Sequence, residues 1–549
     1  MDLRGKGVFL TGGANGLGRA FTEKLLYRKA RVLFCDIYTV AGKAAECELQ
    51  AKYGVNNVIF VKADVTDEEQ LTDAFKEAVS KFGAVDICVN NAGIMDERIW
   101  DKMLAVNTVS HIRGSLLALE HMRMDRGGRG GVIINVVALA GLFPFSYCPA
   151  YSASKHAMIG FTRSWAISPE QPDHGVRWCC LCPQATDTEF MVFREDRIYM
   201  KDAIIKRNEE KGLLPVVEVV EAFMKLVLDP DNNGAILEVT KENGTRYRKR
   251  QMVDPDGVSN PILVDKCRDD KHLLRTFRKL TVVMDPQGKG VFLTGGAQGL
   301  GRGTVDKLLS LGAKVLFCDI NVEKGRATEA ELQEQYGVDV VFFHPADVSD
   351  DKQHKAAFQR AVSKFGTVDI YVNNAGIMNE NTWEKMIAVN VGGYIRGSLQ
   401  ALEHMRRDRG GRGGVIINVA SKAGLIPSLC FPSYVASKHA VVGFTTSWAM
   451  SPDQKDHGVR WCCLCPDPID TSMIKNNNNI YHQELFEQYV KENGVMPVSQ
   501  VAEVIIKLIR DPENNGAILE VSLRKGANYR RRQVVDRDGV SDLVVVDTY

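Results

Sequence analysis

Short, continuous apolar runs alternate with longer segments of helical period in the first half of the chain. Residues 6–11 form the first apolar run, and a glycine-rich turn and a helical segment at 19–27 follow it. Apolar runs of this kind are typical of strands buried on both faces of a parallel sheet, with helices as the crossovers. The pattern predicts an α/β fold with a Rossmann-type, doubly wound parallel sheet. Further strands are predicted at 30–36, 57–64, 85–91, 132–137 and 176–182, and further helices around 44–49 and at 68–82 and 101–124.

The same pattern occurs a second time, so the chain contains an internal repeat. The run Val8-Phe-Leu-Thr-Gly-Gly13 recurs 283 residues later as Val291-Phe-Leu-Thr-Gly-Gly296. Later in the repeat, Asn232 and Asn514 begin a common run at an offset of 282, so one residue has been gained or lost between these points. A period of this length indicates two whole domains rather than a solenoid. We predict two tandem Rossmann-type domains: a first copy at 1–253, a linker at 254–284 and a second copy at 285–549.

The turn after the first strand has glycines at the spacing of a dinucleotide-binding turn. Gly12 allows the tight turn, Gly16 lets the backbone approach a pyrophosphate, and Gly18 lets the following helix pack closely on the strand. The N-terminus of that helix would present free N–H groups to phosphates. Asp36, at the end of the second strand, would accept hydrogen bonds from a ribose hydroxyl and repel a 2′-phosphate, which favours NAD over NADP. The cofactor positions predicted from this region are Gly12, Gly16, Leu17, Gly18 and Asp36 and, in the second copy, Gly295, Gly299, Leu300, Gly301 and Asp319.

A tyrosine, a lysine and a serine in the second copy are arranged for acid–base chemistry. Tyr434 and Lys438 are four residues apart and would lie on one face of a helix, and Ser421 closes the apolar strand before it. A phenol has an ordinary pKa of about 10, and a nearby ammonium favours the phenolate, so Lys438 would bring the pKa of Tyr434 toward working pH. Ser421 would hydrogen-bond the substrate oxygen. A Tyr-x-x-x-Lys pair alone is more often two surface residues of a helix, but the motifs that precede it favour the catalytic interpretation.

Composition and charge narrow the classes of function. The chain of 549 residues is 45% hydrophobic and 25% charged with a net charge of +1, which gives no indication of a nucleic-acid partner. No apolar run reaches the roughly 18 residues of a membrane span, and the start lacks the apolar core of a signal peptide. We therefore expect a cytoplasmic protein with a small-molecule substrate. The basic clusters at 246–250 and 530–532 are interpreted as solvated tails.

The thirteen cysteines of the chain indicate reduced thiols, because no secretory signal accompanies them. Two clusters, Cys179-Cys-Leu-Cys182 and Cys462-Cys-Leu-Cys465, resemble metal-binding sequences. Each lies in an apolar run, where alternate side chains face opposite ways and do not converge on one ion. We therefore predict a buried strand at both places and no metal.

Taken together, the motifs of both copies resemble those of the short-chain dehydrogenase/reductase family. The matching pieces are Thr-Gly-x-x-x-Gly-x-Gly, Asn-Asn-Ala-Gly, the strand-end Ser and Tyr-x-x-x-Lys, in this order and across nearly the whole chain. Within the family, Asn-Asn-Ala-Gly-Ile-Met, Trp-Glu-Lys-Met, Ala-Ser-Lys-His, Gly-Phe-Thr and Asn-Gly-Ala-Ile-Leu are similar to the NAD-dependent 15-hydroxyprostaglandin dehydrogenases. The resemblance implies an oxidoreductase that uses NAD.

The resemblance also implies roles for individual residues. Tyr434 would be the acid/base, Lys438 would lower its pKa and hold the nicotinamide ribose, and Ser421 would orient the substrate. Asn390 would fix a water in a proton relay. The implied cofactor positions of the second copy are Asp347, which would meet the adenine, Val348, Asn374, Lys438 and Thr471, which would face the nicotinamide carboxamide. In the first copy they are Asp64, Val65, Asn91, Lys155 and Thr188 for the cofactor and Asn107, Tyr151 and Lys155 for catalysis.

The two copies differ at the catalytic serine. In the first copy, Ala138 takes the place of Ser421, thirteen residues before the tyrosine. Loss of one preorganised donor to a reacting oxygen costs about 10²–10³ in rate. We therefore predict that the first copy binds NAD and turns over poorly.

Positions near the substrate also depart from the family pattern. The prostaglandin enzymes have a glutamine three residues before the tyrosine, where this chain has Cys148 or Phe431. Family members usually have a glycine after the Cys-Pro that ends the sixth strand, where this chain has Gln184 or Asp467. Because of these departures, we do not carry the prostaglandin substrate over to this chain. Phe431 favours an apolar secondary alcohol or ketone as the substrate.

The leading hypothesis is an NAD-dependent enzyme that transfers hydride between NAD and an apolar, lipid- or prostaglandin-like secondary alcohol or ketone, mainly in the second copy. The stretches 188–212 and 471–495 diverge most between the copies and would line the substrate pocket. The alternative is a non-catalytic NAD-binding scaffold built from a duplicated dehydrogenase fold, which Ala138 favours for half of the chain. Because family members pair through the Tyr-x-x-x-Lys helix and the helix before it, self-association is expected, within one chain as a pseudo-dimer or between chains.

Overall fold

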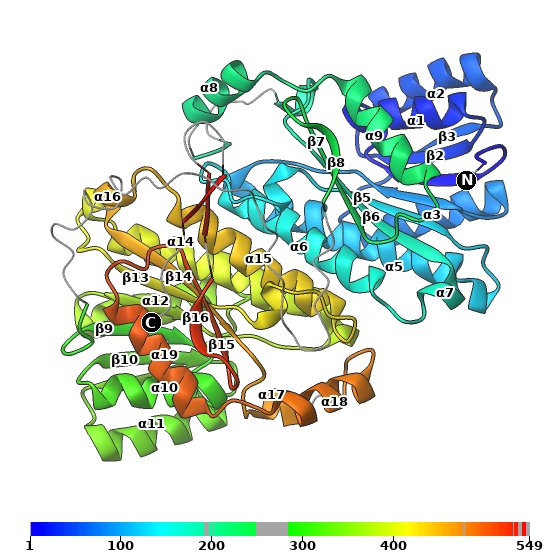
Figure 1. The fold of residues 1–549 in the computed structure, drawn as a ribbon. Coiled ribbons are helices and arrows are strands. Elements are labelled where there is room, and N and C mark those ends of the chain that lie inside the picture. Colours follow the sequence, from blue (N-terminus) through cyan, green and yellow to red (C-terminus); the bar gives the residue numbers. More distant parts are fainter. Residues whose placement is uncertain are drawn as a thin grey trace. The chain divides into compact units, whose positions relative to one another are not determined.

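Two eight-stranded sheets form the framework of the computed structural model (Figure 1). The structure describes residues 2–191, 197–199, 201–248, 284–475, 478–530, 532–535 and 541–544. The first sheet contains, in spatial order, β3 (Val58–Lys62), β2 (Arg31–Asp36), β1 (Gly7–Thr11), β4 (Ile87–Asn90), β5 (Gly131–Val136), β6 (Val176–Pro183), β7 (Ala235–Thr240) and β8 (Gly244–Tyr247). The second contains β11 (Val341–Pro345), β10 (Lys314–Asp319), β9 (Gly290–Thr294), β12 (Ile370–Asn373), β13 (Gly414–Val419), β14 (Val459–Pro466), β15 (Ala517–Ser522) and β16 (Gly526–Tyr529). In each sheet seven strands run parallel and the last is antiparallel, and β17 (Arg532–Val535) pairs with β18 (Ser541–Val544) apart from both.

Helices cover both faces of each sheet, which confirms the predicted doubly wound α/β class (Figure 1). Those of the first copy are α1 (Gly16–Tyr27), α2 (Thr39–Tyr53), α3 (Glu68–Phe82), α4 (Trp100–Leu104), α5 (Ser110–Met122), α6 (Pro149–Ala166), α7 (Gln171–His174), α8 (Lys201–Lys211) and α9 (Val216–Leu228). Those of the second are α10 (Gly299–Ser310), α11 (Val322–Tyr336), α12 (Asp351–Phe365), α13 (Trp383–Ile387), α14 (Tyr394–Met405), α15 (Pro432–Ala449), α16 (Gln454–His457), α17 (Ser472–Lys475), α18 (Gln483–Asn493) and α19 (Val498–Arg510). Within the described ranges, no helix is long and apolar enough to cross a membrane.

The strands coincide with the apolar runs of the sequence because both of their faces are buried. On one face of the first sheet, Phe21 of α1 stacks on Phe223 of α9 with ring centroids 4.2 Å apart. On the other face, Phe9 of β1 meets Phe75 of α3 edge-on at 5.2 Å. The run Cys179–Cys182 lies within β6, where every residue is buried, and its counterpart lies in β14. The strands predicted at both cysteine clusters are thereby confirmed.

A turn of π-helix divides the long helix that the sequence predicts at 101–124. α4 passes into a π-helical turn at Ala105–Val109 and then into α5. The second copy has the same interruption at Ala388–Gly393, between α13 and α14. Turns of this kind are frequent at functional sites. Here they contain Asn107 and Asn390, two of the predicted site residues.

The described part of the basic cluster in the first copy begins in a paired strand and not in a tail, which corrects the interpretation from sequence, although the side chains of Arg246 and Arg248 are partly exposed to solvent. Arg246 lies in β8, and Arg246 and Arg248 both pair with Glu238 of β7, at 3.2 and 2.8 Å. The Glu238 side chain is nearly fully buried, and a buried carboxylate needs such cationic partners. In the second copy, Arg530 pairs with Glu520 at 2.7 Å in the same way. Residues 249, 250 and 531 of these clusters lie outside the described residues.

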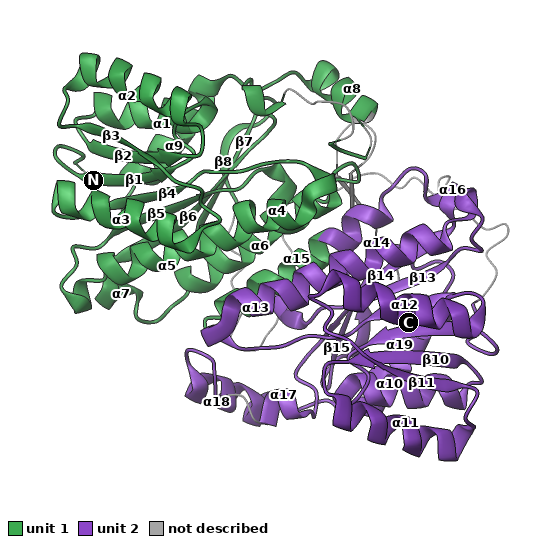
Figure 2. Ribbon diagram, turned by 180° about the vertical axis from the view of Figure 1, so that it is seen from behind, with its two compact units in different colours: residues 1–250, 427–443 green, residues 251–426, 444–549 purple. Residues whose placement is uncertain are grey.

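The chain divides into two compact units, coloured green and purple in Figure 2. Unit 1 contains residues 1–250 and 427–443, and unit 2 contains 251–426 and 444–549. Unit 1 therefore includes a short segment from the second copy, whose Ser428 N donates to Ser164 Oγ of α6 at 3.1 Å. The domain boundaries that we predicted from the repeat stay predictions, because residues 254–283 of the predicted linker lie outside the described residues.

Candidate active site

The glycine-rich turn of the first copy is compact because two of its glycines leave no room for a side chain. Gly12 has a φ of 69°, in the left-handed region, and a Cβ at Gly18 would overlap the carbonyl oxygen of Gly12. Asn91, just beyond β4, donates from Nδ2 to the carbonyls of Thr11 and Gly12 at 3.1 and 2.9 Å and so ties two strand ends together. The second copy repeats these contacts with Gly295, Gly301, Thr294 and Asn374.

The N-terminus of α1 is open at the position where a pyrophosphate would lie. Its first residue, Gly16, has a φ of 55°, and a Cβ there would meet Thr188 only at an ordinary 3.7 Å. Asn15, the residue before the helix, makes no side-chain cap. A helix N-terminus without a cap has N–H groups available to an anion. In the second copy, Thr471 lies close to Gly299 at the start of α10, so both predicted threonines reach this position.

The predicted adenosine-side carboxylates lie at the carboxyl ends of the neighbouring strands. Asp36 accepts from the backbone N–H groups of Ala14 and Tyr38 at 3.0 and 3.1 Å, so its carboxylate fixes the glycine turn against β2. Asp319 does the same in the second copy, with both distances 3.0 Å. Asp64 and its counterpart Asp347 each accept from a backbone N–H and a hydroxyl two residues on, which fixes the turn after the third strand.

Lysine, tyrosine and asparagine of the first copy converge at the carboxyl ends of β4 and β5. Lys155 Nζ donates to the carbonyl of Val136 at 3.1 Å and lies 5.7 Å from the centroid of the Tyr151 ring. A Cβ at Gly93 would lie 3.4 Å from Asn107 Oδ1 and 3.7 Å from Lys155 Nζ. The fold of this copy therefore brings together the three residues that the sequence predicts for its site.

Hydrogen bonds hold Asn107 in the π-helical turn. Its Oδ1 accepts from the N–H of Ile94 at 2.9 Å, and its Nδ2 donates to the Ile94 carbonyl at 2.9 Å and to Ser154 Oγ at 3.1 Å. Ser154 lies on α6, directly before Lys155, so Asn107 connects the π-helical turn to the helix that carries the lysine. In the second copy, Asn390 makes the same two bonds to Ile377 at 2.9 Å.

Burial controls the protonation of the tyrosine and the lysine in the first copy. It raises the pKa of Tyr151 well above the ordinary value of a phenol. It lowers the pKa of Lys155 from 10.5 to about 8. The phenol of this copy is therefore protonated at neutral pH, which differs from the acidic phenol that the sequence predicts for the second copy.

The corresponding residues of the second copy occupy the same elements. Tyr434 and Lys438 lie on α15, with Lys438 Nζ 5.6 Å from the centroid of the Tyr434 ring, in the segment that groups with unit 1. Phe431 meets Tyr434 edge-on at 5.6 Å. Ser421 follows β13 in unit 2, where its Oγ accepts from the N–H of Ala423 at 3.2 Å. Ala138 follows β5 at the same position in the first copy and offers no hydroxyl.

Glu97 is a residue of the site that sequence reasoning missed. Its carboxylate accepts from the N–H groups of Ala150 and Tyr151 at 3.0 and 2.8 Å and thereby caps the first turn of α6. Burial raises its pKa to about 8, although the two N–H groups favour the charged form. Glu380 takes the same place in the second copy, and this repetition is the sequence signal that could have identified the pair.

A second missed feature is a polar cluster of Lys422, Asp467 and Tyr489 in the second copy. Lys422 Nζ lies 3.0 Å from Asp467 Oδ1, and the Tyr489 hydroxyl lies within 3.3 Å of both. Burial alone would lower the pKa of Lys422, but Asp467 and Tyr489 together outweigh it and the pKa is raised. The departure from glycine at Asp467 is the only sequence signal of this cluster.

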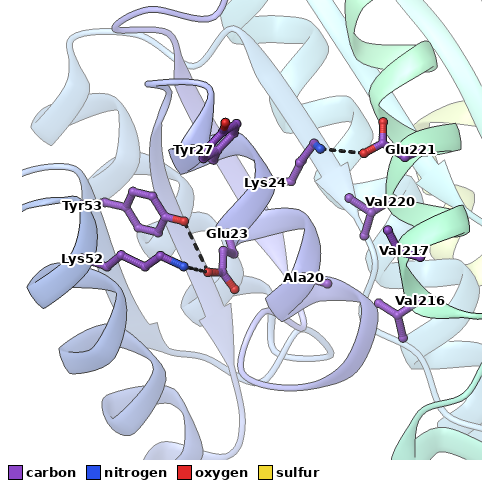
Figure 3. A pocket seen from close by; sticks show the side chains of 10 residues that line it. All are labelled: Ala20, Glu23, Lys24, Tyr27, Lys52, Tyr53, Val216, Val217, Val220 and Glu221. Atoms are coloured by element: carbon purple, nitrogen blue, oxygen red, sulfur yellow. Dashed lines mark hydrogen bonds and ion pairs between the residues drawn. The ribbon is translucent and has the colours of Figure 1, made fainter.

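A shallow groove of about 440 Å³ in unit 1 lies apart from these residues (Figure 3). Figure 3 shows Tyr27 and Tyr53 on one side and Val216, Val217 and Val220 of α9 on the other. Ion pairs of Lys24 with Glu221 and of Lys52 with Glu23 satisfy its charges, both at 2.6 Å. None of the predicted site residues lines this groove.

Comparisons with known proteins agree with this description. The sequence model of the short chain dehydrogenase family matches twice, at residues 6–198 and 289–482. The 15-hydroxyprostaglandin dehydrogenases [NAD(+)] of Macaca fascicularis and Homo sapiens are 38% and 37% identical to this chain over 254 residues, which are 45% of this chain and 96% of each relative. Among solved structures, the C-domain of a bacterial malonyl-CoA reductase with NADP has a TM-score of 0.62 and 14% identity and covers 94% of this chain and 99% of its own, a likeness of fold alone. The resemblance predicted from the motifs is confirmed, and the chain belongs to the short-chain dehydrogenase family of oxidoreductases, whose fold it contains twice.

Proposed function

We propose that the second copy catalyses the transfer of hydride between NAD and an apolar secondary alcohol or ketone. The observation that carries the proposal is the difference at one strand end. The second copy has Ser421 together with Asn390, Tyr434 and Lys438, whereas the first copy has Ala138 in place of the serine. A donor to the reacting oxygen typically contributes about 10²–10³ in rate, so the copy with the serine is the better catalyst.

In the proposed oxidation, Tyr434 removes the proton from the substrate hydroxyl while Ser421 hydrogen-bonds the same oxygen. The bound NAD supplies the hydride acceptor. Lys438 lies one helical turn after Tyr434, where its positive charge stabilises the phenolate that accepts the proton. In reduction the same phenol returns the proton. The first copy supports this proposal by analogy. There Tyr151, Lys155 and Asn107 lie together, on elements that correspond to those of Tyr434, Lys438 and Asn390.

NAD fits the residues of the glycine turn better than NADP. The turn has a cradle that a Cβ at Gly18 or Gly301 would fill, and an open helix N-terminus at Gly16 or Gly299. Asp36 and Asp319 place a carboxylate at the end of the second strand of each copy, where it would accept bonds from ribose hydroxyls and repel a 2′-phosphate. The NAD of the hydroxyprostaglandin relatives supports the same choice.

A non-catalytic scaffold is the second candidate, and Ala138 favours it for the first copy. A copy that retains the cofactor turn and lacks the serine would bind NAD and stabilise the chain without turnover. We also propose that the Tyr-x-x-x-Lys helices self-associate within one chain. The support for this is that residues 427–443 group with unit 1, where a Cβ at Gly160 of α6 would contact the ring of His439. Measuring the mass in solution would test it, since an obligate assembly of chains contradicts internal pairing. The cytoplasmic location stays a prediction.

Two matched tyrosine variants of the full chain test the proposed function. NADH production would be measured over a panel of secondary alcohols for the wild type, Tyr434→Phe and Tyr151→Phe. Because a positioned acid/base contributes about 10²–10⁴, we expect Tyr434→Phe to lose at least about a hundredfold of the rate and Tyr151→Phe to lose only a small part. NADH binding, followed by fluorescence, shows that each variant still folds. Equal losses, or full activity of Tyr434→Phe, would contradict the assignment to the second copy. A wild type that binds NADH but produces none from any alcohol of the panel would favour the scaffold.

A further inference from the structure

Lys422, Asp467 and Tyr489 form a closed, half-buried polar cluster in unit 2. The cation of Lys422 and the carboxylate of Asp467 are 3.0 Å apart, and their side chains are only 19% and 11% exposed. The hydroxyl of Tyr489 accepts from Lys422 Nζ at 3.3 Å and donates to Asp467 Oδ1 at 3.2 Å. The charge of the lysine is therefore compensated within the protein.

The cluster joins two strand ends to the variable helix of the second copy. Lys422 follows Ser421 directly, and Asp467 follows Pro466, the last residue of β14, which pairs with β13. Ligands of open α/β sheets bind outside the carboxyl ends of the strands. Tyr489 lies on α18 (Figure 1), within the stretch that diverges most between the copies. A charge at this place would therefore act on the substrate.

The first copy has no such cluster at the matching positions. Leu139 occupies the position that corresponds to Lys422, and Gln184 occupies the position that corresponds to Asp467. Gln184 donates to the carbonyl of Gly212 at 3.0 Å and carries no charge. Arg207 stands for Tyr489, and its guanidinium stacks 4.6 Å above the centroid of the Phe145 ring. The ion pair at the strand ends is thus a property of the second copy among the described residues.

We propose that Asp467 determines the substrate class of the second copy. By neutralising Lys422 and holding Tyr489, it makes the mouth of the site accept an uncharged secondary alcohol and disfavour one that carries a carboxylate. An incoming carboxylate would meet the charge of Asp467 and would have to displace it from Lys422, and both effects oppose binding. This inference rests on the proposed function, because it places the substrate at the carboxyl ends of β13 and β14.

The test compares two ligands that differ by a single group, 2-decanol and 9-hydroxydecanoate, in which a carboxylate replaces the terminal methyl group. Their dissociation constants would be measured by calorimetry on the full chain with NADH present, so that no turnover occurs. We expect the wild type to bind 2-decanol more tightly. In Asp467→Asn the unpaired Lys422 should shift the ratio of the two constants about tenfold toward the carboxylate, as one partly exposed charge pair allows.

Two controls separate a charge effect from a merely structural one. The shift should vanish in the double variant Asp467→Asn/Lys422→Met, because no cation is then left to attract the carboxylate. It should also shrink in about 0.5 M salt, which screens a charge but does not repair a displaced helix. A ratio that stays within about twofold of the wild type in Asp467→Asn would overturn the inference, and so would a wild type that binds neither ligand. Failure of the wild type to produce NADH would overturn the proposed function instead, since the binding ratio does not depend on turnover.

Discussion

The two copies of the fold retain the same framework and differ where a substrate would lie. Both have the glycine turn held by Asn91 or Asn374, and both have an asparagine in a turn of π-helix. They differ at the strand ends, where Ser421 replaces Ala138 and Asp467 replaces Gln184. Residues that shape the cofactor turn contact their own backbone, so a change there would disturb the fold. A strand-end side chain that faces a ligand can change at little cost to the fold, which is how one framework acquires two different sites.

The largest expected effect comes from exchanging the residues that distinguish the two sites. Ser421→Ala should lower kcat by about 10²–10³, because it removes a donor to the reacting oxygen. The reciprocal change, Ala138→Ser, should give the first copy activity that it lacks, and it is best measured in the Tyr434→Phe background where the second copy is silent. Steady-state NADH production by the full chain measures both effects.

Fragments are unsuitable for this comparison, because unit 1 includes residues 427–443. NADH binding and a thermal melt of each variant show whether the exchange altered the fold. A Ser421→Ala variant with undiminished kcat would mean that the serine is not part of the catalytic set. A silent Ala138→Ser variant that binds NADH normally would mean that the first copy lacks more than a hydroxyl.

A smaller effect is expected from the carboxylates that select the cofactor. Asp319→Asn removes the negative charge that a 2′-phosphate would meet, and its amide oxygen can still accept from one of the two N–H groups, those of Ala297 and Asn321, that the carboxylate binds. The ratio of NADPH to NADH dissociation constants should fall about tenfold at that site, and Asp36→Asn should do the same at the other. Fluorescence titrations with both cofactors measure each site. If neither variant changes the ratio, the carboxylates act only on the turn, as their backbone bonds already show that they do.

Much of the fold could be predicted from the sequence because local patterns fix it. The apolar runs mark the strands to within a residue or two, since a strand buried on both faces has few polar positions. The role of the glycines can also be predicted from the sequence, because the overlap of a Cβ at Gly18 with the carbonyl of Gly12 depends only on the local backbone. The steric demands of these elements lie within a few residues of one another, and a sequence pattern therefore contains them.

The parts that could not be predicted depend on partners distant in sequence. Glu97 caps α6 through residues more than 50 positions later, and Lys422 meets Tyr489 after 67 positions. The basic cluster of the first copy pairs with Glu238, which lies in the preceding strand, and the sequence pattern does not show that this carboxylate is buried. Each of these contacts satisfies a buried polar or charged group, and burial is known only once the sheet and its helices are assembled.

An effect on stability, and not on activity or cofactor choice, is expected from the carboxylate that caps the tyrosine helix of the first copy. Its pKa is raised from 4.5 to about 8 in the folded protein, so between these values the folded state holds a proton that the unfolded state has released. The stabilisation from this proton is complete below the unfolded pKa, and it is lost as the pH rises toward 8, by at most about 1.4 kcal/mol per pH unit. Glu97→Gln cannot titrate, so its free energy of unfolding should depend less steeply on pH in this range.

Urea unfolding at a series of pH values measures this slope, and activity plays no part in it. Glu97→Gln should also be less stable than the wild type at low pH by about 1–3 kcal/mol, because its amide group cannot accept from both Ala150 and Tyr151. Glu380→Gln is the matched variant of the second copy, and its slope shows whether both tyrosine helices are capped by a protonated carboxyl. If the slope of Glu97→Gln equals that of the wild type, the carboxylate is ionised throughout, and the two N–H groups of α6 outweigh its burial.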